Sequence, residues 1–231
     1  MIIKILLIAF IGSLLCLDRI LIQIMVSRPI IIASLTGLIL GNPYTGLIVG
    51  AILELFWIDR IPIGIYIPPN DSIVAVVATS AAILATQSQT DIKPDMIALA
   101  VLMAIPFGIL AKKLDVRIMD ANNKLSDQAL DDAKKLDIHA IEKKTYMGIA
   151  RVFAVYFIFI LIAQIILISL FTWMYPHLPD PVIGMLKMTY YFLPLLGIAV
   201  ALNTIKLRGA IPVFCAIFLA IAAVLEFLHV F

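Results

Sequence analysis

The chain has 231 residues, of which 63% are hydrophobic and 14% are charged, with a mean hydropathy of +1.11 and a formal net charge of +2. A soluble domain is about 45–50% apolar and about 25% charged, so this excess cannot be buried in one globular core and predicts an integral membrane protein embedded in the lipid bilayer. The small net charge gives no electrostatic basis for nucleic-acid binding.

Apolar residues gather in segments along the whole chain, which we treat as a single membrane domain over 1–231. The segments run at about 2–26, 29–58, 72–90, 96–111, 148–175, 182–205 and 209–231. The first begins near Lys4 and resembles the core of a signal peptide. Because Asp18 and Arg19 follow without a small-residue cleavage site, we interpret it as the first membrane segment.

Segment 29–58 is interrupted by Asn42 and Pro43. Its halves have 13 residues (29–41) and 15 residues (44–58). At 1.5 Å per residue, neither half crosses a hydrocarbon core of about 30 Å. Asn42 is a good N-cap and Pro43 suits the first helical position, so one helix is predicted to end near Gly41 and a second to start at Pro43. The alternative to this re-entrant hairpin is one long helix kinked at the proline.

Glu54 is the only charged residue in the most apolar stretch of the chain. A carboxylate at the centre of a membrane helix costs about 2.5–3.5 kcal/mol to insert, so it is expected to face a cavity or a partner. Gly46, Gly50 and Glu54 are spaced by four residues and share one helix face. Glycine pairs there and at Gly37 and Gly41 allow close helix packing. Glu54 is therefore a candidate site residue; the alternative is a structural acid paired with an arginine.

The segment 61–69 carries three prolines and one glycine, so it cannot form a regular helix. Irregular backbone at membrane depth occurs where protein or a water-filled cavity surrounds it. Asn70, Asp71 and Ser72 are predicted to cap the next helix. The following segments are also short, and short segments interrupted by proline point to a transport site.

The window 112–146 holds 8 of the 17 lysines and arginines and 7 of the 15 acids. We expect it to be a helical excursion in water, and the basic residues at both of its ends place it in the cytoplasm. It is either a solvated linker or a docking surface for a cytoplasmic partner. Segments 148–175 and 209–231 are predicted to be ordinary spans.

Motifs of enzymes are absent from the sequence. There is no phosphate-binding loop, zinc-protease motif, nucleophile elbow or dinucleotide fingerprint. The three histidines, His139, His177 and His229, lie far apart, and Cys16 and Cys215 lack metal-type spacing. We therefore predict no catalytic residue, no metal site and no cofactor in this chain.

Several stretches share the pattern of one family, which is roughly RP, then GxxLG, then TGxxxG, then LE. They are Arg28-Pro29, Gly37 to Gly41, Thr45 to Gly50 and Leu53-Glu54. In these stretches, and in Gly64 to Pro69, the chain resembles the IIC subunit of the mannose/fructose/sorbose phosphotransferase system. The resemblance implies a bacterial inner-membrane permease that binds a hexose and pairs with a IID membrane subunit, as a trimer of heterodimers. A soluble IIB subunit would then phosphorylate the sugar, so the phosphoryl-carrying residues belong to the partners.

The resemblance also implies roles for single residues. Glu54 stands at the family's glutamate, Pro69 at its proline, and Asn70 where many relatives have aspartate. Some mannose relatives carry two acids where this chain has Ile22 and Gln23. The predicted substrate-binding residues are Glu54, Asn70, Asp71, Gln23 and Pro69. Carboxylates and amides would together suit the hydroxyl groups of a neutral polyol.

The sequence thus predicts an all-α polytopic membrane protein with broken helices, which acts as a IIC-type sugar permease. Sugar bound near 43–58 and 61–72 would be presented to the cytoplasm by an elevator-like or rocking movement. Two alternatives stay open. One is an ion-coupled secondary transporter with Glu54 as its proton carrier. The other is a scaffold or receptor that recruits cytoplasmic proteins through 112–146.

Overall fold

The computed structural model describes residues 1–60, 66–86 and 92–204, together with a few isolated residues beyond. Within this part the chain is helical and contains no strand, which confirms the all-α prediction. The helices are α1 (Ile2–Cys16), α2 (Pro29–Leu40), α3 (Pro43–Phe56), α4 (Asp71–Leu84), α5 (Pro94–Lys134), α6 (Ile138–Met174) and α7 (Asp180–Thr204), with short 3-10 helices at Leu17–Arg19 and Tyr175–His177. Most of the predicted span 209–231, and residues 61–65 of the proline-rich segment, lie outside the described residues.

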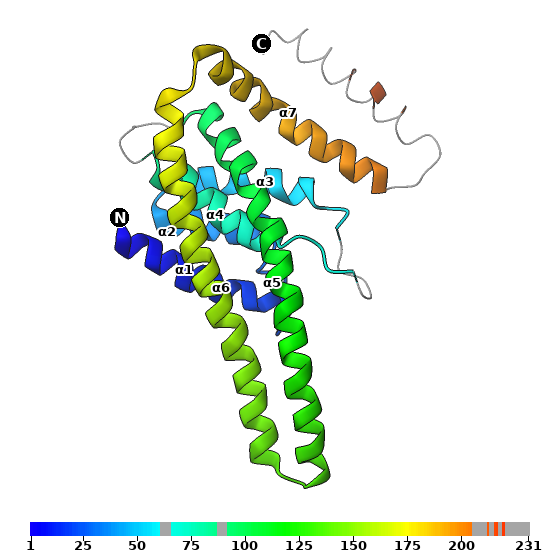
Figure 1. Ribbon diagram of the computed structural model, residues 1–231. Helices are drawn as coiled ribbons and strands as arrows, with labels where there is room; N and C mark the ends of the chain where they lie inside the picture. Colours follow the sequence, from blue (N-terminus) through cyan, green and yellow to red (C-terminus); the bar gives the residue numbers. More distant parts are fainter. Residues whose placement is uncertain (61–65, 87–91, 205–211, 213–214, 217–218, 220–231) are drawn as a thin grey trace.

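Helices α5 and α6 form a long antiparallel pair that projects beyond the other helices (Figure 1). The projecting end contains the charged window, which confirms that 112–146 is helical. Asp137 caps α6 by accepting a hydrogen bond from the Ala140 amide at 3.0 Å. The two arms are joined by an ion pair between Lys144 and Asp132.

Among the residues that the structure describes, three helices, α5, α6 and α7, are long and apolar enough to cross a membrane. In contrast, α2, α3 and α4 have only 12, 14 and 14 residues, as expected for broken or re-entrant segments. One prediction was wrong: segment 96–111 is not a short helix. It continues without a break into the charged window as the 41-residue α5.

The break between α2 and α3 is a helical hairpin and not a kink. Gly41 ends α2 in the left-handed region, with φ at 90°, where a residue without Cβ is favoured. The Asn42 side chain then accepts a hydrogen bond from the Thr45 amide at 3.1 Å, and Pro43 opens α3. Both predicted end signals are confirmed.

Glycines bring the two hairpin helices into backbone contact. A Cβ on Gly37 would lie 2.9 Å from the Gly46 Cα, and one on Gly46 would lie 2.3 Å from the Ala33 carbonyl oxygen. A Cβ on Gly50 would lie 2.7 Å from the carbonyl oxygen of Pro29. Gly41 differs from the predicted packing role, since nothing lies within 4 Å of its Cβ position. It serves the turn and not the helix contact.

Helix α4 lies at the centre of the fold, and every residue from Ser72 to Leu84 is buried. Helices α2, α3, α5 and α6 all pack against it. Gly12 of α1 lies against Val76, and a Cβ on Gly12 would lie 3.0 Å from a methyl group of that valine. Gly108 of α5 lies against Val74 in the same way, at 2.6 Å. These close contacts hold the N-terminal half of α4 against α1 and α5, and the candidate site lies there.

Candidate functional site

A cavity of about 500 Å³ lies at the end of α1, between the segment 66–68 and helices α5 and α6. Its volume falls within the range of about 300–1,000 Å³ that is typical of small-molecule sites. The wall mixes apolar and polar side chains. The polar members are Arg19, Gln23, Tyr66, Asp115, Asn122, Asn123 and Tyr156.

Asp115 is the acid of this cavity, and it was not among the predicted site residues. It is only 9% exposed and accepts hydrogen bonds from the Asn70 amide nitrogen at 3.1 Å and the Tyr156 hydroxyl at 3.0 Å. Because many charged residues surround it in the sequence, Asp115 was assigned to the helical excursion in water. A signal was present, because Asp115 continues the buried stripe of Gly108 and Ala111 at helical spacing.

Asn70 has the predicted capping role. Its side-chain oxygen accepts from the Ile73 amide at 3.1 Å at the start of α4, while its nitrogen donates to Asp115. The side chain is fully buried, and its backbone amide donates to the Gly108 carbonyl at 3.2 Å. Asn70 therefore orients Asp115, and it lies behind the cavity wall.

Asp71 accepts a hydrogen bond from the Arg19 guanidinium at 2.7 Å. The same carboxylate oxygen accepts from the Ser72 amide at 3.0 Å. The two charged side chains are about one-fifth exposed, so the pair is partly hydrated. Asp71 thus fixes the position of Arg19. Of the two residues, Arg19 is the one that lines the cavity. After Asp115, it is the second cavity residue that was not among the predicted site residues.

Gln23 lines the cavity directly, from the loop between α1 and α2. It adopts a positive φ of 57°, which is uncommon for a residue other than glycine. Asp18 holds this loop, because its carboxylate accepts from the Ile24 amide at 2.9 Å and from the Ser27 amide at 3.2 Å. The loop is also joined to α4, since the Ser72 hydroxyl donates to the Ser27 carbonyl at 2.6 Å.

Glu54 does not lie in the pocket with Asn70 and Asp71 that the sequence predicted. Its carboxylate lies 3.1 Å from the Arg28 guanidinium, and its other oxygen accepts from the Ile30 amide at 3.4 Å. The carboxylate thus lies at the N-terminus of α2, where the helix dipole favours an anion. Glu54 does not line the 500 Å³ cavity. The arginine-paired alternative describes it, although the Arg28 side chain is 43% exposed and the contact is not dry.

Pro69 borders a separate, open hollow of about 410 Å³. Tyr66 belongs to both cavities, and the Lys112 ammonium lies 5.2 Å from its ring centroid. Over the described ranges, no group of three or more His, Cys, Asp or Glu side chains is placed to hold a metal ion.

Comparison with known proteins matches this chain to one family. A family model described as the sorbose-specific IIC component of the PTS system covers residues 2–230. The chain belongs to this family. Its cavity can therefore be considered as part of a IIC permease component.

Relatives within the family differ in the sugar they are named for. The chain is 26% identical to the sorbose-specific EIIC component of Lacticaseibacillus casei, over 92% of this chain and 74% of the relative. It is 30% identical to N-acetylgalactosamine permease IIC component 1 of Escherichia coli strain K12, over 55% of this chain and 46% of the relative. The matched region thus spans about half the length of the N-acetylgalactosamine relatives.

Two solved structures share the fold. One is a membrane protein with a TM-score of 0.73 and 22% identity, over 96% of this chain and 85% of the other. The second is the mannose transporter ManYZ in complex with microcin E492, solved by cryo-EM, with a TM-score of 0.64 and 21% identity, over 96% of this chain and 87% of the other.

Proposed function

We propose that this chain is the sugar-translocating subunit of a phosphoenolpyruvate-dependent phosphotransferase complex, and that the 500 Å³ cavity binds the hexose. The observation that carries the proposal is the buried Asp115 carboxylate on the cavity wall, near Arg19 and Gln23. Sugar hydroxyls both donate and accept hydrogen bonds. A carboxylate that accepts and guanidinium and amide groups that donate would bind such a ligand on several sides.

The predicted site residues take two kinds of role in this proposal. Gln23 contacts the sugar, whereas Asn70 and Asp71 act through the side chains that they hold, Asp115 and Arg19. Glu54 and Pro69 shape the surroundings of the cavity. Glu54 does so by joining α3 to the start of α2.

The proposed complex includes a IID membrane subunit, in a trimer of heterodimers in the bacterial inner membrane. A soluble IIB subunit would phosphorylate the sugar at the cytoplasmic side, so this chain itself carries out no phosphoryl transfer. The projecting hairpin of α5 and α6 is a suitable docking surface for that subunit, because charged residues cover it. We expect the sugar to reach this side by an elevator-like or rocking movement.

Neither alternative function gains support from a specific feature. The proton-carrier hypothesis was motivated by an unexplained acid, and the Arg28 contact now gives Glu54 a structural role. The scaffold hypothesis does not account for a cavity whose wall carries the buried carboxylate of Asp115, because burying a charged group is costly.

Uptake measurements test the proposal. Cells that express the chain with its partner subunits are given radiolabelled sorbose, mannose, fructose or N-acetylgalactosamine, with and without the soluble phosphocarriers. We expect uptake of at least one sugar to require the phosphocarriers, to persist with an uncoupler and to yield the sugar phosphate inside. Uptake that collapses with the uncoupler and survives loss of the phosphocarriers would contradict the proposal and favour ion coupling. A purified complex that binds none of these sugars would favour the scaffold.

A further inference from the structure

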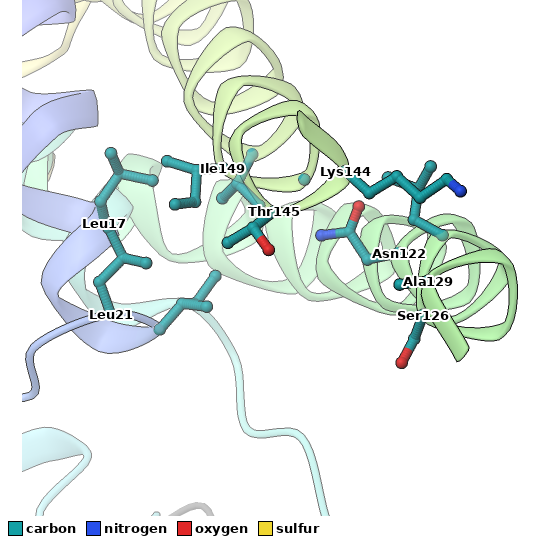
Figure 2. A pocket seen from close by; sticks show the side chains of 12 residues that line it. Leu17, Leu21, Asn122, Ser126, Ala129, Lys144, Thr145 and Ile149 are labelled. Carbon is teal, nitrogen blue, oxygen red and sulfur yellow. The ribbon is translucent and has the colours of Figure 1, made fainter. Parts of the chain in front are cut away.

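A second cavity, of about 270 Å³, lies beside the first, between the end of α1 and the α5–α6 hairpin (Figure 2). Its two sides differ in chemistry. Leu17 and Leu21 reach across from the α1 end, while the Asn122 amide and the Thr145 hydroxyl stand on the hairpin side (Figure 2). The cavity therefore has an apolar side at α1 and a mixed side on the hairpin, where the polar groups stand among apolar residues such as Leu125 and Ile149.

The two cavities are neighbours along the groove between α5 and α6. They share three wall residues, Ile20, Asn122 and Val152. On α5 the combined wall runs from Asp115 to Ala129, a rise of about 20 Å at 1.5 Å per residue. This wall starts at the buried Asp115 and leads toward the charged end of the hairpin.

Asn122 is the polar residue at the junction of the two cavities. Its side-chain oxygen accepts a hydrogen bond from the Arg151 guanidinium at 3.1 Å, and Arg151 also donates to the Ala121 carbonyl at 2.8 Å. Arg151 therefore occupies the oxygen end of the Asn122 amide. The nitrogen finds no acceptor among the residues that the structure describes, so its two N–H groups can serve a ligand.

We propose that, once the elevator-like or rocking movement has occurred, the second cavity is the passage through which the sugar leaves the first cavity toward the cytoplasm, with Asn122 donating hydrogen bonds to its hydroxyls on the way. This inference rests on the proposed function. The smaller cavity falls just below the size range of small-molecule sites, which suits a passage better than a second resting site. Its apolar residues meet the C–H surface of a sugar ring, and the polar groups on the hairpin side meet the hydroxyls.

Filling the passage is the first test. Gly148 lines the second cavity and not the first, and a Cβ there would lie 3.7 Å from the Asn122 nitrogen, which is ordinary contact, so Gly148→Leu adds bulk to the wall of the second cavity. Ala150→Leu is the matched control, on the same helix at a different, open hollow. We expect Gly148→Leu to slow uptake of the transported radiolabelled sugar about tenfold or more while its Kd, measured on the purified complex, stays within about twofold. Ala150→Leu should change neither.

The second test separates ligand binding from a structural role. Asn122→Asp keeps an acceptor for Arg151 but removes both N–H donors. We expect uptake to fall about three- to tenfold, in line with the loss of a hydrogen bond to the sugar. A structural role alone would leave uptake unchanged or improve stability through the new ion pair. Because Asn122 also lines the first cavity, the Kd of this variant is measured as well. Lower uptake with a Kd within about twofold of wild type supports the passage even if Gly148→Leu fails to assemble, whereas a loss confined to the Kd assigns Asn122 to the first cavity and contradicts the passage.

The outcomes distinguish the two levels of the account. Sugar binding by the wild type, together with wild-type uptake by the Gly148→Leu and Asn122→Asp variants, would overturn the passage and leave the proposed function standing. Absence of sugar binding by the wild-type complex would overturn the proposed function itself, and the passage with it.

Discussion

Two acids, Glu54 in a helix of the short hairpin and Asp115 in the long helix α5, show how differently such residues are used. Glu54 stands alone in an apolar run, yet it is paired with Arg28 outside the cavity. Asp115 lies in a charge-rich stretch, yet it is buried on the cavity wall with Asn70 and Tyr156 as its partners. An acid that stands alone in an apolar stretch of sequence indicates that burying its charge costs free energy. The residues around the acid determine whether an ion pair within the fold or a bound ligand offsets that cost.

The largest expected effect concerns the hairpin around Glu54, which we regard as a packing device. Gly46→Ala places a Cβ 2.3 Å from the Ala33 carbonyl oxygen, and this backbone atom cannot move aside easily. We expect a loss of about 1–3 kcal/mol in stability and reduced recovery of the purified complex. Gly184→Ala is the control, since nothing lies within 4 Å of its Cβ position. Equal thermal unfolding of both variants would show that the hairpin does not depend on this contact.

The cavity around Asp115 should respond to changes that leave packing intact. Tyr156→Phe keeps the buried ring and removes only the hydroxyl that donates to Asp115. The loss of one hydrogen bond is worth about 1 kcal/mol, so we expect sugar affinity to fall about fivefold because Asp115 is no longer held in place. Equilibrium binding to the purified complex measures this. Tyr146→Phe, at an exposed position on the same helix, should leave affinity unchanged.

The smallest effect is expected at Glu54. Glu54→Gln weakens a pair whose arginine is 43% exposed, and such pairs contribute between about 0 and 1 kcal/mol. We expect sugar affinity to stay within about twofold of wild type. Adding Arg28→Gln should cost little more, because both changes remove the same contact. A large, specific loss of affinity in Glu54→Gln alone would place this acid in the binding site after all.

Local chemistry explains which features could be predicted from the sequence. The end of α2 at Gly41, the capping by Asn42 and the capping by Asn70 each depend on a few neighbouring residues, and all three are confirmed. The partners of Glu54 and Asp115 depend on contacts between segments far apart in the chain. Asp115 was missed because its neighbours carry charge, while its burial comes from packing against Asn70 and α6.

Equilibrium binding of the transported sugar to an Asp115→Asn variant shows whether the cavity around Asp115 is the sugar site. The substitution keeps the size of the side chain and removes the charge, and Asp120→Asn on the exposed face of the same helix is its control. We expect Asp115→Asn to weaken sugar binding about tenfold or more, while Asp120→Asn binds as the wild type does. Wild-type affinity in an assembled Asp115→Asn complex would contradict the assignment of this cavity as the sugar site.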